Sequence, residues 1–422
     1  MAAHPVRVHV TDDLHRSRLT VFFRLLLAIP HFIWVFLWTV IAGVAAVVNW
    51  IATLILGRSP ELLHRFLAAY IAYQIQLRAY LALAANPYPA FDGSPGYPVD
   101  VDIPPPQPQS RWTVVVRLLL ALPALILTTL FFGFPFAGAS RRGRRRNSGG
   151  GGGGVLGGLS FTVAFLAWFA CLARGEMPRG FRDLQTYQLR YGAQAWAYAF
   201  LLTDRYPDTD TAEPRGPQEP PSHPITLRVD DDLRRSRLTV FFRLLLSIPH
   251  LVWLGLWWIA AVVIAIPVWF IVLATGRLPA SLHRFYAAFI RYGTHVGAFL
   301  YLAANPFPGF VGQPGYPTEV EIGGPERQNR WITGFRIILV IPAFMVAAPL
   351  GSVAFVAAVF GWFVSLFLGR MPLGLRNFIA FAVRYSAQVY AYVFLLTDRY
   401  PDSGPRQHEP AEEDAAELVP AV

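Results

Sequence analysis

One stretch of sequence returns along the chain, and this repetition constrains the fold more than any other feature. Residues 17–31, Ser-Arg-Leu-Thr-Val-Phe-Phe-Arg-Leu-Leu-Leu-Ala-Ile-Pro-His, recur almost unchanged at 236–250 and in weaker form at 110–124 and 329–343. Each copy holds an Arg and a Pro at fixed positions inside an apolar run. Similarity at constant spacing indicates a duplicated supersecondary unit. We therefore expect four repeated units that share one local fold.

The repeats also set the expected boundaries. The stretches 204–222 and 402–422 are rich in Pro and acidic residues, a composition typical of linkers and disordered tails. We predict a first membrane half at 1–203 (units 1–92 and 93–203), a linker at 204–222, a second membrane half at 223–401 (units 223–311 and 312–401) and a disordered acidic tail at 402–422.

The composition places the chain in a membrane. Hydrophobic residues make up 54% of it and charged residues 15%, whereas soluble domains carry roughly 25% charged residues. The apolar residues form blocks, at 32–56, 118–138, 155–173, 251–274 and 335–368, and apolar runs of about 18 residues or more are typical of membrane spans. We predict a mainly α, polytopic (multi-pass) protein of the cell (plasma) membrane.

The net charge is +10, and the sequence contains no Lys, so Arg carries the basic charge. The Arg residues flank apolar runs, which favours a cytoplasmic membrane face and anionic headgroups over nucleic acid. We expect membrane lipids, above all anionic ones, as partners, with a second copy of the chain or another membrane protein as a further partner.

The parts of each unit follow one order. A short alternating segment, such as 6–10 or 99–103, predicts a half-buried strand. A residue that can cap a helix follows: Ser17, Ser110, Ser236 or Asn329. Its side-chain oxygen can accept a backbone N–H of the first turn. The helix then runs through the repeated Arg to the Pro, which removes one backbone hydrogen bond and bends the helix.

The second unit indicates how the apolar run is divided. Between residues 139 and 154 it holds a cluster of Arg followed by a run of Gly. Hydrocarbon does not tolerate such a segment, so it must be a loop between two spans. By position, we expect a transmembrane helical hairpin in every unit.

An amphipathic helix is predicted at the end of each unit, with polar residues four apart on one face. It can lie in the membrane interface, which gives about eight spans in all, or it can cross, which gives about twelve spans with adjacent units inverted. The polar stripe favours the interface. Its residues are Arg182, Thr186, Arg190, Gln194 and Tyr198 in the second unit and Arg376, Arg384, Gln388 and Tyr392 in the fourth.

The arginines form the candidate site, because a charge within a span is costly and points to function. Guanidinium groups can hold the phosphate or carboxylate groups of lipids. Alternatively, each Arg of the repeated stretch extends from near its helix start to the headgroups. The predicted lipid- or anion-binding residues are Arg24, Arg117, Arg243, Arg336, Arg190 and Arg384.

Other chemistry finds little support. Without Lys there is no phosphate-loop lysine, Schiff base or Ser-Lys pair, and the sequence has no metalloprotease or Gly-x-Ser-x-Gly motif. His31 and His250, which follow the prolines, can serve a metal or a proton relay or, more simply, cap the bent backbone. We expect no catalytic residue, no metal site, no cofactor and no enzymatic activity.

Three sequence patterns resemble those of a known family. They are Arg-Leu-Leu-Leu-x-Ile-Pro-His at 24–31 and 243–250, Tyr-Pro-Val at 97–99, and Leu-Thr-Asp-Arg-Tyr-Pro at 202–207 and 396–401. Over nearly the whole chain they resemble the bacterial integral membrane family of domain of unknown function 4389. The resemblance implies repeats of strand, apolar hairpin and Arg-Tyr helix, and it brings no known activity. The first unit departs from the pattern at Ala72, where the other units have Arg.

These observations favour a non-enzymatic, lipid-contacting scaffold or assembly component. The alternative is a transporter or channel built from repeated units, with the polar helix stripes lining a path. An enzyme acting on lipid ranks third, because no catalytic set of residues is recognisable.

Overall fold

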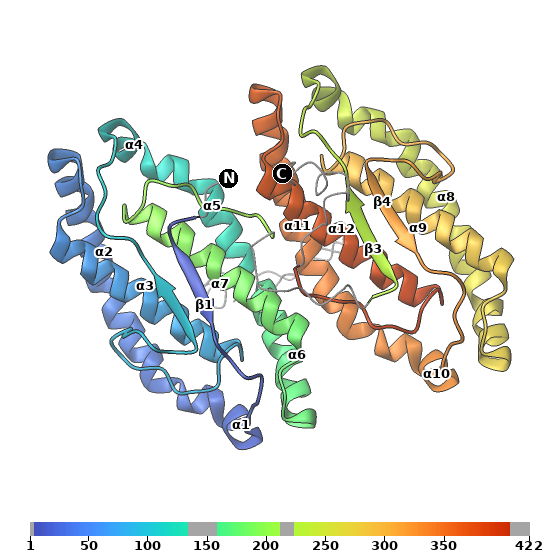
Figure 1. The fold of residues 1–422 in the computed structure, drawn as a ribbon, viewed down its shortest axis with the longest axis horizontal. Helices are drawn as coiled ribbons and strands as arrows, with labels where there is room; N and C mark the ends of the chain where they lie inside the picture. Colours follow the sequence, from blue (N-terminus) through green and yellow to red (C-terminus); the bar gives the residue numbers. More distant parts are fainter. Residues whose placement is uncertain (1–3, 134–157, 212–222, 406–422) are drawn as a thin grey trace, which may run out of the picture. The chain divides into compact units, whose positions relative to one another are not determined.

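The computed structural model describes residues 4–133, 158–211 and 223–405. The chain is mainly helical and divides into two compact units, residues 1–208 and 209–422. From here on these two are called the first and the second unit, and the four repeated units expected from the sequence are called repeats. Each unit contains a two-stranded antiparallel sheet and a set of helices (Figure 1). The predicted basic loop at 139–154, and most of the predicted linker and tail, lie outside the described residues.

The elements of the first unit are β1 (Arg7–Val10), α1 (Arg18–Leu27), α2 (Ile29–Leu56), α3 (Glu61–Leu81), β2 (Val99–Asp102), α4 (Arg111–Val115), α5 (Arg117–Phe132), α6 (Leu159–Arg174) and α7 (Arg179–Ala199). Those of the second unit are β3 (Ile225–Val229), α8 (Arg237–Thr275), α9 (Ala280–Leu300), β4 (Thr318–Ile322), α10 (Arg330–Leu339), α11 (Ile341–Leu368) and α12 (Leu373–Val393). The strands predicted at 6–10 and 99–103 are confirmed as β1 and β2.

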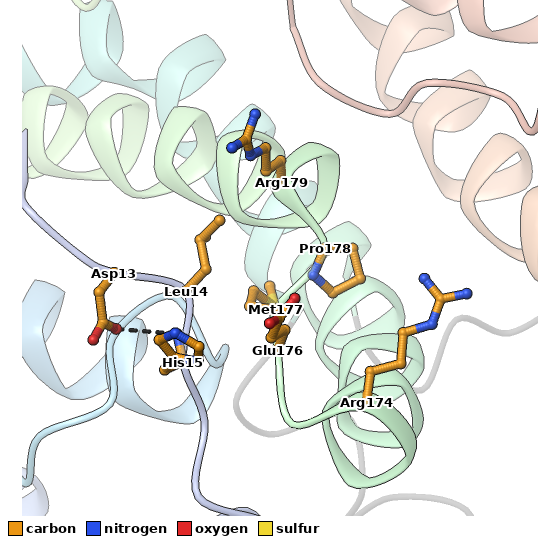
Figure 2. A pocket seen from close by; sticks show the side chains of 8 residues that line it. All are labelled: Asp13, Leu14, His15, Arg174, Glu176, Met177, Pro178 and Arg179. Atoms are coloured by element: carbon orange, nitrogen blue, oxygen red, sulfur yellow. Dashed lines mark hydrogen bonds between the residues drawn. The ribbon is translucent and has the colours of Figure 1, made fainter.

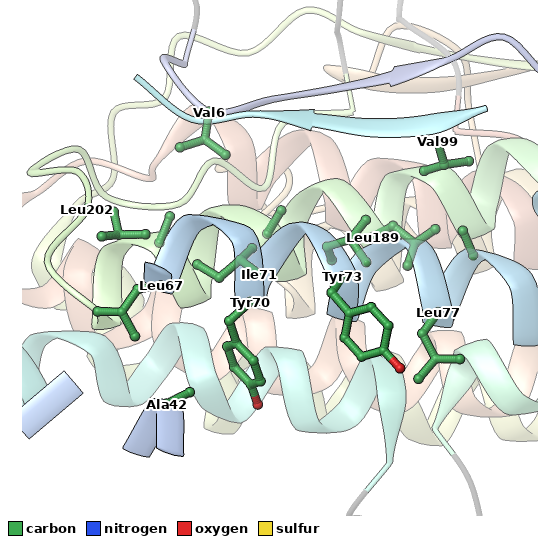
Figure 3. Packing of buried hydrophobic residues seen from close by; sticks show 14 of the residues in the cluster. Val6, Ala42, Leu67, Tyr70, Ile71, Tyr73, Leu77, Val99, Leu189 and Leu202 are labelled. Atoms are coloured by element: carbon green, nitrogen blue, oxygen red, sulfur yellow. The ribbon is translucent and has the colours of Figure 1, made fainter. Parts of the chain in front are cut away.

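Each unit is built in three layers. In the first unit the sheet contacts α3 and α7, which in turn pack against α2 and α5. Figure 3 shows Val6 and Val99 on the sheet side of α3, and Ala42 of α2 on the opposite side. In the second unit the sheet contacts α9 and α12, which pack against α8 and α11. We call α3, α7, α9 and α12 the central helices and the remaining helices the outer helices.

The sheet of the first unit has one apolar and one charged face. Val8 and Val10 pack against the core, whereas the alternating residues point away from it. Across the strands Arg7 pairs with Asp102 and His9 with Asp100. Arg7 and Asp102 carry opposite charges, and such a pair directly across two antiparallel strands stabilises the register.

The central helices are buried, and their polar stripe faces the protein interior rather than lipid headgroups. Gln194 of α7 is 2% exposed and Gln388 of α12 is 1% exposed. The amide Nε2 of Gln194 donates to the carbonyl oxygen of Val6 at 3.2 Å. The amide Nε2 of Gln388 donates to that of Ile225 at 2.9 Å. A buried amide requires such partners, and the strand beside each helix supplies them.

The outer helices bury only a narrow stripe. In α8 the buried and half-buried side chains recur every three to four residues, and most of those between them are exposed and apolar. Three outer helices, α2, α8 and α11, are long and apolar enough to cross a membrane. The chain is therefore a membrane protein by the composition and length of these helices.

The predicted helical hairpin is wrong for the apolar runs of the second unit. Residues 237–275 form one helix of 39 residues that includes Pro249 and Pro267. Residues 341–368 likewise form one helix of 28 residues that includes Pro349. A buried or lipid-facing Pro costs a helix one backbone hydrogen bond without forcing a turn. In the first unit, the run 18–56 is interrupted only at Ala28, between α1 and α2.

Helices α5 and α6 are two parts of one outer helix rather than the arms of a hairpin. A Cβ atom placed on Gly158 would lie 2.4 Å from the backbone nitrogen of Gly133 and 2.4 Å from the carbonyl oxygen of Phe131. The chain thus leaves the helix at Gly133 and returns to the same point at Gly158. Each part has 16 residues, about 24 Å, which is shorter than the roughly 30 Å of hydrocarbon.

The predicted helix caps are correct in position and only partly in mechanism. Ser17, Ser110, Ser236 and Asn329 each precede a helix with an extended backbone. Only the side chain of Asn329 accepts a backbone N–H among these four, that of Trp331 at 2.9 Å. The serines make no side-chain cap hydrogen bond, because propensity places a cap residue without fixing its rotamer.

Candidate functional site

Arg24 points from α1 into the first unit and is bonded to the end of α3. Its Nη1 donates to the carbonyl oxygens of Tyr80 at 2.6 Å and Ala85 at 3.1 Å. Its Nη2 donates to the side-chain oxygen of Asn86 at 3.3 Å. The guanidinium lies over the Tyr80 ring, 4.3 Å from the centroid. Arg24 is 2% exposed, so it makes these contacts out of reach of a headgroup layer.

The other three arginines of the repeated stretch make equivalent contacts. Each donates to backbone carbonyls in the last turn of a central helix or just beyond it: Arg117 to Thr203 (3.3 Å), Arg243 to Phe299 (2.5 Å) and Ala304 (3.0 Å), and Arg336 to Tyr392 and Thr397. Each also lies over an aromatic ring: Arg117 over Tyr198 (4.2 Å), Arg243 over Phe299 (4.4 Å) and Arg336 over Tyr392 (4.5 Å). None is more than 3% exposed.

These contacts make the four arginines C-terminal caps of the central helices. The last carbonyls of a helix have no partner within it, and a cation there also complements the helix dipole. Arg117 adds an ion pair, 2.6 Å from its Nη2 to Asp204. The guanidinium donors that were predicted to hold anions are thus directed at the chain's own carbonyls.

Sequence reasoning missed a second set of capping residues. Four leucines that follow the central helices have a positive φ: Leu83 (62°), Leu201 (63°), Leu302 (64°) and Leu395 (64°). This conformation is costly for a branched side chain. The side chains of Arg16, Gln109, Arg235 and Gln328 donate to their carbonyl oxygens, in that order. Their position in the sequence could have identified these donors, because each one directly precedes the cap residue of the repeated stretch.

Arg190 and Arg384, the remaining predicted site residues, lie on α7 and α12. Arg384 donates to the carbonyl oxygen of Gly404 at 2.5 Å, and Arg190 lies over the Tyr187 ring, 5.3 Å from its centroid. Both are 7% exposed. Arg384 thus connects α12 to the segment that follows it.

His31 and His250 are buried among aromatic rings. The Nδ1 atom of His31 is 2.8 Å from the hydroxyl of Tyr73, and that of His250 is 2.8 Å from the hydroxyl of Tyr292. Phe91 stacks on the His31 ring at 4.3 Å. The histidines therefore connect an outer helix to a central helix. In residues 4–133, 158–211 and 223–405, no group of three or more His, Cys, Asp or Glu is placed to hold a metal.

Two further histidines precede the strands. The Nδ1 of His4 accepts the backbone N–H of Val6 at 3.1 Å, and the Nδ1 of His223 accepts that of Ile225 at 3.1 Å. Burial lowers the pKa of both imidazoles, that of His223 to about 4. Burial therefore favours the neutral imidazole, whose unprotonated Nδ1 accepts the hydrogen bond.

A hollow of about 330 Å³ lies where the segment after β1 meets the turn between α6 and α7 (Figure 2). Acidic and basic side chains line it, among them Asp13, Glu176 and Arg174. The backbone N–H of His15 donates to Asp13 at 3.0 Å. In Figure 2, Arg174 and Arg179 extend away from Asp13. The charged groups therefore do not converge on one point.

One set of exposed arginines lies at the ends of the outer helices. Arg18 donates to the carbonyl oxygen of Ala173 at 3.1 Å, and Arg237 to that of Phe367 at 3.0 Å. Positively charged side chains therefore lie at both ends of the outer helices. The exposed members of this set are Arg18, Arg58, Arg111, Arg174, Arg237, Arg277, Arg330 and Arg370.

The comparisons with known proteins identify a family and nothing more specific. No curated protein and no solved structure matches the chain. A family model described as a domain of unknown function (DUF4389) matches residues 18–92, 237–311 and 330–403. The second of the four expected repeats, 93–203, is not among the matched residues, and it is the repeat that carries the insertion after Gly133. The three matches together cover more than half of the chain, which therefore belongs to the DUF4389 family.

Proposed function

We propose that the chain is a non-enzymatic membrane protein that contacts lipid through its outer helices and serves as a scaffold. The exposed apolar face of these helices carries the proposal. On α8 it includes Leu238 (70% exposed), Leu244 (71%) and Val263 (62%). Exposed apolar patches of this extent mark contact with a membrane or with another protein.

The energetic argument favours lipid. Moving one exposed Leu, Ile or Phe side chain out of water gains about 1.5–3 kcal/mol. Summed over the exposed side chains of α8, this is on the order of tens of kcal/mol. Such a gain supports stable membrane attachment.

The exposed arginines at the helix ends support an anionic lipid partner. A cation near an anionic membrane surface contributes about 1 kcal/mol. Arg18, Arg58, Arg277 and Arg370 are exposed, whereas the arginines of the repeated stretch are engaged inside the fold. We therefore assign headgroup contact to the former group.

The finer sequence predictions belong to this proposal. Four repeats of one fold are supported by the shared contacts of Arg24, Arg117, Arg243 and Arg336. A multi-pass arrangement in the plasma membrane is one way to place the outer helices in hydrocarbon, and a single-leaflet arrangement is another. The transporter alternative receives less support, because Gln194 and Gln388 of the polar stripe are bonded to backbone groups.

Membrane fractionation and vesicle flotation test the proposal with the full chain. We expect it to resist extraction with alkaline carbonate, and to float with vesicles after reconstitution. The variant R18Q/R58Q/R277Q/R370Q should still float with vesicles but lose most of the preference for vesicles with 30% anionic lipid over neutral ones, because about 1 kcal/mol is lost per exposed Arg. The control R65Q changes an Arg that is already paired with Glu61. A chain that stays in the aqueous fraction without detergent would contradict the proposal.

A further inference from the structure

We infer that each unit lies flat in one leaflet, with its sheet in water and its outer helices parallel to the membrane plane. The partner is a lipid surface, and the inference rests on the proposed function. It concerns how the outer helices enter the membrane. The sequence predicted only arrangements in which helices span the bilayer, with about eight or about twelve spans.

The order of the layers defines the direction of the membrane. In the first unit the charged face of the sheet and the apolar face of α2 lie on opposite sides of α3. Figure 3 shows this order directly, with Val6 and Val99 above α3 and Ala42 below it. Water must meet the first face and hydrocarbon the second. The membrane normal therefore runs through the layers, at right angles to the helices.

A spanning orientation would place the sheet at the depth of the hydrocarbon. The strands run alongside the middle of α3, since in Figure 3 Val6 lies above the part of α3 that holds Leu67 and Val99 above the part that holds Leu77. If α3 crossed the bilayer, Asp100 and Asp102 would lie near its centre. A carboxylate there costs at least about 2.5–3.5 kcal/mol. In the flat orientation the sheet faces water, and this cost does not arise.

The second unit repeats this arrangement with other residues. The outward positions of its sheet include Arg228 and Glu321, and both side chains are exposed. The sheet packs on α9 and α12, which in turn pack against α8 and α11. The same direction of the membrane normal therefore follows for this unit on its own.

The length of the apolar face also fits the flat orientation. On α8 the exposed apolar side chains run from Leu238 to Ile271, a distance of about 50 Å along a helix. The hydrocarbon core is roughly 30 Å thick. A helix would need a tilt of about 50° to hide this face while crossing, which is more than the 0–40° or so seen for spanning helices.

The charges at the helix ends agree with this orientation. Arg237 begins α8 and Arg277 follows it, and both are exposed. A spanning helix commonly has its excess of Arg on one side only. In a flat helix both ends lie at the same depth, so both side chains can extend to headgroups of one leaflet.

Cysteine accessibility in sealed vesicles tests the inference. In the full chain with the buried Cys171 changed by C171S, single cysteines are introduced as S236C and R277C at the two ends of α8 and as E321C on the sheet. Right-side-out and inside-out vesicles are treated with a membrane-impermeant maleimide. We expect all three sites to react from the same side. The control V263C, on the exposed apolar face, should react only after solubilisation.

Labelling of S236C and R277C from opposite sides would overturn the inference while leaving the proposed function intact. Absence of the chain from the membrane fraction would overturn both. The equivalent pair R18C and R58C, at the ends of the outer run of the first unit, gives an independent readout should a variant of the second unit not fold. The same two outcomes then apply to the first unit.

Discussion

The guanidinium of Arg24 lies over the ring of Tyr80, 4.3 Å from its centroid, and also donates to the carbonyl oxygen of the same residue at 2.6 Å. One residue thus supplies an aromatic face and a helix-terminal carbonyl to one cation. Both contacts act where solvent is excluded, so the cation–π and hydrogen-bond terms are not weakened by water. The same relationship joins Arg336 to Tyr392.

This relationship predicts that Arg24 is needed for stability. We expect R24M to lower the free energy of unfolding by about 3 kcal/mol, because it leaves buried carbonyls without a donor. R24K should be almost as harmful, since an ammonium cannot reproduce the planar fork. Thermal unfolding in detergent measures both. R65M, which removes an ion pair whose side chains are 74% and 72% exposed, should change the stability by less than about 0.5 kcal/mol. Equal effects of R24M and R65M would contradict the capping role.

Gln388 should hold the first strand of the second unit to α12. Its Nε2 donates to the carbonyl oxygen of Ile225 at 2.9 Å, and its Oε1 accepts the backbone N–H of Asp402 at 2.9 Å. We expect Q388L to speed amide exchange in 225–229 and 402–404 by roughly tenfold or more, because both groups lose their partners. Hydrogen-exchange mass spectrometry reports this by segment. Q313L, at an exposed position, serves as the control. Unchanged amide exchange in Q388L would show that Gln388 does not hold β3 to α12.

The histidine before β3 predicts a stability that falls with acid. The pKa of His223 is about 4 in the folded chain and about 6.5 unfolded. Because the folded pKa is depressed, the contribution of His223 is present above the unfolded pKa and is lost as the pH falls through it towards 4. The loss between pH 7 and pH 5 should be about 2 kcal/mol.

The variant H223N tests this assignment. Asn keeps an acceptor for the Ile225 N–H and does not titrate. The unfolding midpoint of H223N should therefore depend less on pH than that of the parent chain, measured by differential scanning fluorimetry between pH 7 and pH 5. An identical pH dependence in both proteins would show that His223 does not carry the effect.

The junction of Gly133 and Gly158 predicts that the insertion is dispensable for folding. Deleting residues 134–158 leaves the same separation between Arg117 and Gly175 as between Arg336 and Gly369. We expect one continuous helix in place of α5 and α6, with the unfolding midpoint kept within a few degrees. Circular dichroism and thermal unfolding measure this. A large loss of helicity would show that α5 and α6 are separate helices.

The sequence predicted the elements better than their arrangement. Ser17 and Asn329 were placed correctly at helix starts because cap preference is local. The inward direction of Arg24 could not be predicted, since its partners Tyr80 and Ala85 lie 56 and 61 residues away. The hairpin prediction failed because the loop inserted in one repeat was assumed to divide the apolar run of every repeat. In α11, Pro349 stays within the helix.

The depth of the outer helices tests the central claim most directly. Spin labels at Leu238, Val252, Val263 and Ile271 of α8, all exposed, and at Glu321 on the sheet are compared in vesicles by accessibility to oxygen and to a water-soluble nickel complex. We predict that the α8 positions favour oxygen to a similar degree along the helix, and that Glu321 favours nickel. High nickel accessibility at Val252 and Val263, equal to that at Glu321, would show that this face lies in water and would contradict the account.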